Sequence, residues 1–103
     1  MTNQELEYRA LKILEQQPDL SQRELADKLG ISLGKTNYLI KALLNKGLLM
    51  INNFKTADNK LRYLYILTPK GLEVRRKLTI LFLQRKSEEF DKLKKEIERI
   101  QDT

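Results

Sequence analysis

The sequence predicts a mainly α-helical fold with one small β-hairpin and a long C-terminal helix. Apolar residues recur at helical spacing up to residue 48, alternate over residues 49–67, and return to helical spacing from residue 69. No proline or glycine follows Gly71, so about 30 residues remain for one uninterrupted helix. We therefore expect a folded domain over residues 1–68 and a helical arm over residues 69–103.

The first expected helix covers residues 3–17, and a proline follows its end. Tyr8 lies beside the apolar side of this helix, where it either packs on the core or contacts a second chain. The spacing is typical of an amphipathic helix that packs on other helices. Its apolar side consists of Leu6, Ala10, Ile13 and Leu14.

The stretch 21–48 indicates two short helices joined by a tight turn. Ser21 is a favourable N-cap, and Glu24 three residues later completes a capping box. Gly30 ends the first of these helices, because it adopts the left-handed conformation without a Cβ clash. Ser32 can cap the next helix at once, and such a short link is typical of a helix-turn-helix.

The helix over residues 32–46 has two different faces. The face expected to meet the core consists of Thr36, Leu39, Ile40, Leu43 and Gly47. The opposite face holds lysines, amides and a tyrosine but no carboxylate, whereas a merely solvated face usually mixes charges of both signs. Such a face suits phosphates and base edges. We predict a DNA recognition helix with the contact residues Ser32, Gly34, Lys35, Asn37, Tyr38 and Lys41.

Individual roles follow from side-chain chemistry. The Asn37 amide can pair bidentately with N6 and N7 of adenine. Tyr38 can meet a thymine methyl or a phosphate, or it can pack on the hairpin. Gly34 either lets the helix approach the DNA backbone or only loosens the helix. Gln22 and Arg23, at the exposed start of the preceding helix, are expected to clamp a phosphate.

Residues 49–54 and 61–67 predict the two strands of a hairpin, with Asp58 and Asn59 as turn formers between them. Three helices followed by such a hairpin make a winged helix-turn-helix. A solvated hairpin tip without a binding role is the alternative to a DNA-contacting wing. We expect contacts to phosphates or the minor groove from Lys55, Asn59, Lys60 and Arg62.

Thr68 and Pro69 are expected to begin the last helix as its N-cap and first residue. Gly71 in the first turn indicates a close backbone approach to the domain. The polar segment 84–89 divides the apolar residues into two groups, and we expect the apolar stripe to shift or bend there. Its own domain is too small to cover this stripe. We predict a coiled-coil-like homodimer contact through Leu78, Phe82, Phe90, Leu93, Ile97 and Ile100.

The net charge of +6 lies within residues 1–83. Residues 84–103 contain six basic and six acidic residues, whereas residues 21–62 contain eight basic and three acidic residues. A basic excess focused on the helix-turn-helix and the wing is typical of a nucleic-acid-binding protein. Charge that only keeps the protein soluble is the alternative.

The sequence contains no cysteine and no histidine. This excludes disulfides and thiolate metal sites and removes the usual general base, so we expect no cofactor, no metal and no enzymatic activity. No signal peptide opens the chain and no apolar run is long enough to span a membrane, so we expect a cytoplasmic protein. The main functional alternative is a winged-helix protein-interaction module.

The chain resembles the MarR-type winged-helix transcriptional regulators in SQRELADKLGIS, in the NKGLL junction and in LTPKG at the start of the last helix. It is similar to the small exopolysaccharide-associated subgroup through LGISLGKTNYLIKALLNKGL, NFK before the wing, NK after it, Tyr63 and Tyr65, and the spaced pairs LT, FL, RK and EF of the last helix.

The resemblance implies a bacterial transcriptional regulator that binds double-stranded DNA, with exopolysaccharide genes among its targets. Together with the expected homodimer, it predicts binding to a pseudo-palindromic site. Larger relatives hold small-molecule effectors between helices at both ends of the winged helix. This chain has no extra N-terminal helix and one C-terminal helix, so we do not expect an effector pocket of that type.

Overall fold

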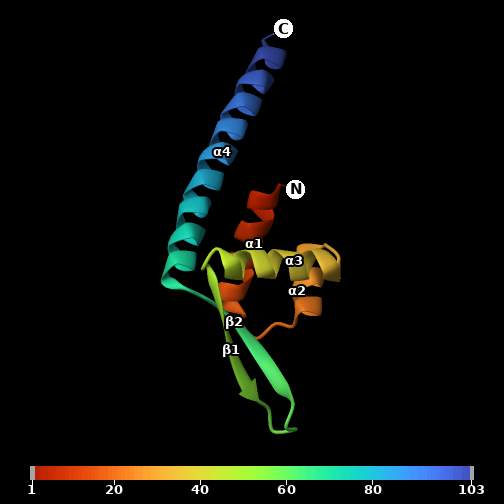
Figure 1. The fold of residues 1–103 in the computed structure, drawn as a ribbon. Coiled ribbons are helices and arrows are strands. Elements are labelled where there is room, and N and C mark those ends of the chain that lie inside the picture. The colour runs from red at the N-terminus through yellow and green to blue at the C-terminus, as the bar shows by residue number, and fades with distance from the viewer. Residues whose placement is uncertain (1, 103) are drawn as a thin grey trace.

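The computed structural model describes residues 2–102, which form four helices and a two-stranded antiparallel sheet. Figure 1 shows the hairpin projecting from one side of a three-helix body and the last helix extending from the other side. This is the winged helix-turn-helix fold that the sequence predicts. In chain order the elements are α1 (Asn3–Gln16), α2 (Gln22–Leu29), α3 (Leu33–Asn45), β1 (Leu49–Lys55), β2 (Leu61–Leu67) and α4 (Pro69–Gln101).

The helix ends follow the local signals in the sequence. Ser21 Oγ accepts a hydrogen bond from the Glu24 N–H at 3.1 Å, and the Ser21 N–H donates to Glu24 Oε1 at 3.3 Å. Gly30 ends α2 in the left-handed conformation, at φ 70°. Ser32 and Thr68 cap α3 and α4 through their hydroxyl oxygens. The predicted capping box and caps are confirmed.

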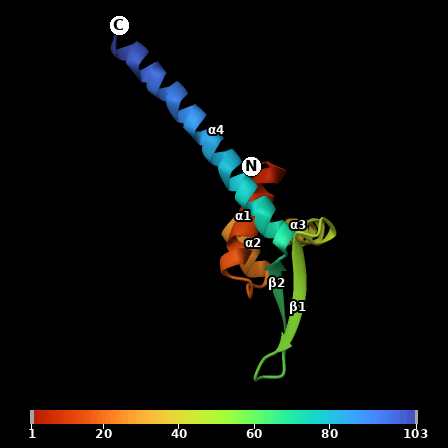
Figure 2. The ribbon, with the colours of Figure 1, turned by 90° about the vertical axis from the view of Figure 1, so that its left-hand side faces the viewer.

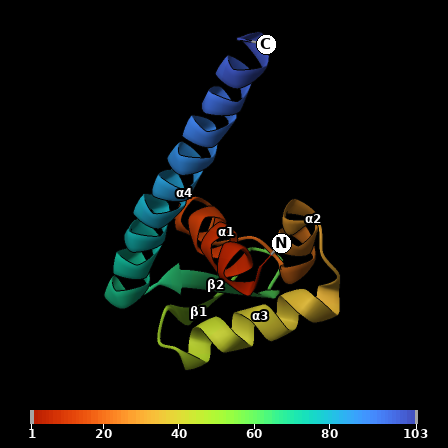
Figure 3. The ribbon, with the colours of Figure 1, turned by 90° about the horizontal axis from the view of Figure 1, so that it is seen from above.

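The hydrophobic core lies between the three short helices and the base of the hairpin. Seen from above, α1 lies between α4 and α2, and α3 runs along one side of the body (Figure 3). Burial in this core fixes how each helix is rotated about its axis. The core consists of Leu6, Ala10, Leu11, Leu14, Leu25, Leu29, Leu39, Ile40, Leu43, Leu48, Leu49, Tyr65 and Leu67.

Only the base of the hairpin takes part in this core. The strands pair in register from Leu49 opposite Leu67 to Lys55 opposite Leu61. Leu49, Tyr65 and Leu67 are buried, whereas the half of the hairpin near the loop is exposed. The hairpin therefore projects from the body as a free wing (Figure 2).

The helix α4 is continuous over 33 residues, including the polar segment 84–89. At its start, a Cβ added to Gly71 would lie 2.0 Å from the carbonyl oxygen of Leu48, which confirms the predicted close backbone approach. The arm makes the molecule 69 Å long but only 26 Å wide.

The first half of α4 packs on α1. Arg75 Nε forms an ion pair with Glu15 Oε2 at 2.9 Å, and Thr79 Oγ1 donates to the Tyr8 hydroxyl at 3.0 Å. The ring centroids of Tyr8 and Phe82 lie 5.1 Å apart. Tyr8 therefore packs within the chain, the first of the two roles that its position allowed.

One sequence expectation is wrong. Gly47 does not face the core, because α3 ends at Asn45 and Gly47 is exposed, at φ 72°. The Gly47 N–H donates to Leu44 O and the Leu48 N–H donates to Leu43 O. Gly47 therefore closes the helix in a Schellman motif. Leu78, one of the predicted dimer-contact residues, is only 8% exposed within the single chain and lies in the packed half of α4.

Candidate nucleic-acid interface

The core sets the rotation of α3, and its opposite side faces outward. Leu39, Ile40 and Leu43 lie in the core, and Thr36 beside them is fully buried. The Thr36 hydroxyl donates to the Ser32 carbonyl oxygen at 2.9 Å, so this buried polar group is satisfied. The core face that the sequence predicts for these four residues is confirmed.

The outward side of α3 is open. Lys35, Tyr38 and Lys41 are exposed, and Tyr38 has 76% of its surface free. A Cβ added to Gly34 would meet no atom within 4 Å. Residues 33–45 include no aspartate or glutamate, so the helix presents positive and neutral donors without an opposing carboxylate. This combination allows close approach of a polyanion.

Asn37 and Ser32 are more constrained than the three exposed residues. Ser32 Oγ caps α3 by accepting from the Lys35 N–H at 3.1 Å, and its side chain is exposed at the helix start. Asn37 is half-buried, and its Nδ2 donates to Gln22 Oε1 at 3.1 Å. The structure thus brings together two predicted contact residues that lie 15 positions apart in the sequence.

The start of α2 lies beside this face. Arg23 is exposed, whereas Gln22 is half-buried and its Nε2 donates to the Tyr65 hydroxyl oxygen at 3.1 Å. Hydrogen bonds from the Ser21 backbone and side chain lower the pKa of Glu24, and Arg62 adds a smaller contribution. The free positive charge at the start of α2 is therefore that of Arg23, next to an ionised Glu24.

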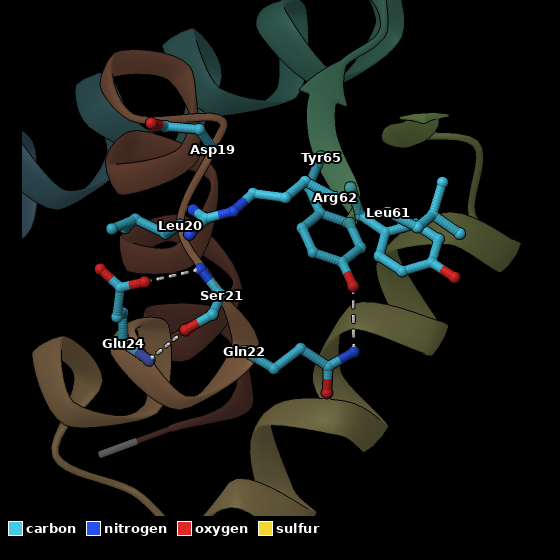
Figure 4. Close-up of a pocket in the computed structure, with 9 residues that line it drawn as sticks. Asp19, Leu20, Ser21, Gln22, Glu24, Leu61, Arg62 and Tyr65 are labelled. Atoms are coloured by element: carbon cyan, nitrogen blue, oxygen red, sulfur yellow. Dashed lines mark hydrogen bonds between the residues drawn. The ribbon is translucent and has the colours of Figure 1, made fainter. Parts of the chain in front are cut away.

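The predicted wing residues divide into two groups. Lys55, Asn59 and Lys60 are exposed at the loop, where Asn59 has φ 62° and its N–H donates to Thr56 O at 2.9 Å. Arg62 is also exposed, but it reaches across a cavity toward Leu20 (Figure 4).

The cavity has a volume of about 580 Å³ and separates β2 from the start of α2. Arg62 and Glu24 both line it, which accounts for the electrostatic effect of the guanidinium on that carboxyl. Arg62 thus acts on α2 in the free protein and stands apart from the lysines of the loop.

Sequence reasoning placed Tyr65 on a strand and gave it no role of its own. The alternation of β2 indicates that Tyr65 shares a face with buried Leu67, which predicts burial. Its hydroxyl bond to Gln22 joins residues 43 positions apart, and no local pattern in the sequence signals that contact.

Residues 2–102 hold no group of histidine, cysteine, aspartate or glutamate side chains that could bind a metal ion. Within the same residues, no helix has the length and apolar character to cross a membrane.

Comparison with known families gives one match over the first half of the chain. Residues 3–50 match the family model described as "Winged helix-turn-helix DNA-binding". These residues cover α1, α2, α3 and the start of β1, and so include both helices of the helix-turn-helix. A comparison with curated protein sequences gives no match.

Solved structures share the fold over most of the chain. A PadR-like transcriptional regulator from Bacillus cereus has a TM-score of 0.76 and 22% identity, covering 85% of this chain and 90% of that one. MarR from Staphylococcus aureus, in complex with salicylate and kanamycin, has a TM-score of 0.64 and 17% identity, covering 84% of this chain and 56% of that one.

MepR, a transcription regulator of the Staphylococcus aureus multidrug efflux pump MepA, has a TM-score of 0.63 and 22% identity, covering 92% of this chain and 75% of that one. At these identities the likeness establishes the winged helix-turn-helix fold. The chain spans only about half of the length of MarR, since the matched part is 56% of it.

Proposed function

We propose that this chain is a transcriptional regulator that binds double-stranded DNA in a sequence-specific manner as a homodimer. The observation that carries the proposal is the outward side of α3, which is open at Gly34, exposed at Lys35, Tyr38 and Lys41, and free of carboxylates. A helix with this surface enters the major groove and presents its donors to base edges. The family match over residues 3–50 supports the same reading.

The contacts divide by role. Lys35, Asn37, Tyr38 and Lys41 approach the bases, while the exposed Arg23 binds a phosphate beside α3. Lys55 and Lys60, on either side of the wing loop, bind the backbone where the hairpin reaches the duplex, with Asn59 shaping the turn between them. Phosphate contacts of this kind hold the domain in register but do not select a sequence.

The homodimer contact that we propose lies on the second half of α4. Phe90, Leu93, Ile97 and Ile100 repeat at spacings of three and four and are 54–67% exposed in the single chain. A groove of about 510 Å³ follows this stripe, lined by Phe90, Leu93, Lys94, Ile97, Glu98 and Gln101.

An apolar stripe beside charged residues suits a second copy of the same helix. Two domains on one arm then meet half-sites about 34 Å apart on one side of the duplex, which gives a pseudo-palindromic site. Phe82 lies nearer the body and contributes at the edge of this contact, because it already packs on Tyr8.

The genes controlled by this regulator are proposed on the resemblance to the exopolysaccharide-associated subgroup, which indicates exopolysaccharide genes as targets. The DNA-binding proposal itself is tested by selecting binders from a duplex library with a randomised centre and then titrating salt. A preferred sequence and a steep fall of affinity with salt are the expected results. Binding without either property would favour a protein-interaction module.

A further inference from the structure

A chain of side-chain hydrogen bonds connects three elements of the domain. Asn37 Nδ2 on α3 donates to Gln22 Oε1 on α2 at 3.1 Å, and Gln22 Nε2 donates to the Tyr65 hydroxyl oxygen on β2 at 3.1 Å. Figure 4 shows Gln22 extending from α2 toward Tyr65. We call these three residues the amide relay. It links the proposed recognition helix to the base of the wing.

Tyr65 is the fixed end of the amide relay. Its side chain is 7% exposed, and its backbone N–H donates to the carbonyl oxygen of Pro18 at 3.0 Å. It also pairs in register with Ile51 across the hairpin. The two amides are half-buried, so they are partly screened from competing water. A buried hydroxyl held by the strand thus sets the position of both amides.

The relay matters because a side-chain amide has an oxygen end and a nitrogen end. Rotation of the amide exchanges an acceptor for a pair of donors at the same place on the surface. Adenine readout needs the oxygen toward N6 and an N–H toward N7, whereas the rotated amide presents the wrong pattern. In the relay, one Asn37 N–H is committed to Gln22, which leaves the other N–H and Oδ1 for a base.

We propose that Gln22 and Tyr65 are positioning residues that hold the Asn37 amide in place through the amide relay and thereby set the base preference of α3. This inference rests on the proposed DNA-binding function. It assigns Gln22 to holding a base-reading side chain, in place of the phosphate contact expected from its sequence position. Tyr65 acts without touching DNA, through Gln22.

The test compares Tyr65→Phe with Tyr63→Phe in full-length protein. Both variants remove a hydroxyl from β2, on the same face of the strand, but only the first cuts the amide relay. Each protein is used to select binders from a duplex library with a randomised centre. Tyr65→Phe should lower the preference for the favoured base about 3- to 10-fold at the base pair whose preference also depends on Asn37. Its affinity for random DNA should be unchanged.

Gln22→Met interrupts the amide relay at a second point and leaves Tyr65 unchanged. It should lower the base preference at the same base pair. Neither variant should change the base preference further in the Asn37→Ala background. Wild-type preference in both variants, or effects that add to that of Asn37→Ala, would overturn the positioning role while leaving the DNA-binding proposal intact. A wild-type protein without any base preference would overturn both.

A measurement on the free protein separates the relay from DNA binding altogether. Asn45 lies on the same helix and is exposed, so its side-chain amide serves as the reference. Hydrogen exchange of the Asn37 side-chain amide should be slower than that of Asn45, and Tyr65→Phe should reduce the difference. Equal exchange rates in the wild-type protein would show that the relay does not hold Asn37.

Discussion

The variant Ile97→Ala tests the proposed dimer contact on α4. Ile97 is 54% exposed in the single chain, so its change should leave the folded monomer intact, and alanine is the stronger helix former. Full burial of an isoleucine side chain is worth about 1.5–3 kcal/mol, and about half of this remains to be gained on association.

The loss occurs once in each chain of the dimer. At roughly 1 kcal/mol per chain, Ile97→Ala should cost the dimer about 2 kcal/mol, which raises its dissociation constant about 30-fold. Lys95→Ala is the matched control, because residue 95 lies about 200° around the helix from residue 97. Its dissociation constant should stay close to that of the wild-type protein.

Sedimentation equilibrium over a concentration series measures both variants against the wild-type chain. A wild-type protein that stays monomeric at tens of micromolar would contradict the proposed dimer contact. Equal dissociation constants for Ile97→Ala and Lys95→Ala would contradict it as well. In either case the exposed apolar stripe on α4 would bind a partner other than a second copy of this chain.

Three further variants test the recognition face, the wing and the start of α4. Gly34→Leu should leave the thermal unfolding temperature unchanged or slightly raised, since the leucine side chain enters open space. It should weaken DNA binding about tenfold or more by holding α3 off the duplex. Unchanged affinity would mean that this face is wrongly assigned. Lys60→Ala should weaken binding to preferred and random DNA alike and flatten the log–log salt slope by about one unit, and a sequence-dependent loss would contradict a phosphate contact. Gly71→Ala should lower the free energy of unfolding, measured by urea denaturation, by about 1–3 kcal/mol, because the alanine Cβ would clash with Leu48 O. Gly34→Ala should not lower it. Equal effects of the two variants would contradict the close approach.

The ends of the helices could be predicted from the sequence because their causes are local. Ser21, Glu24 and Gly30 act on backbone groups only a few residues away, and each adopts the expected role. The burial of α3 was also predictable, since periodicity alone identifies Leu39 and Leu43 as core residues.

The remaining features depend on distances that periodicity does not encode. The apolar stripe of α4 predicts that Phe82 meets a hydrophobic partner, but not that Tyr8 on α1 of the same chain supplies part of it. The helical period placed Gly47 on the core side of α3, whereas the chain leaves the helix before that residue. Gln22 was expected to face a phosphate, and its bond to Tyr65 depends on how the wing packs on α2.

Asn37→Ala and Lys41→Ala test most directly whether the outward face of α3 reads base sequence. Each variant is titrated against the duplex selected by the wild-type protein and against random duplex at the same salt concentration. We predict a loss of about 1–3 kcal/mol per variant on the preferred duplex, roughly 5- to 150-fold in affinity, with little change on random DNA. Equal losses on both duplexes would contradict sequence reading, because the face would then bind the backbone without reading bases.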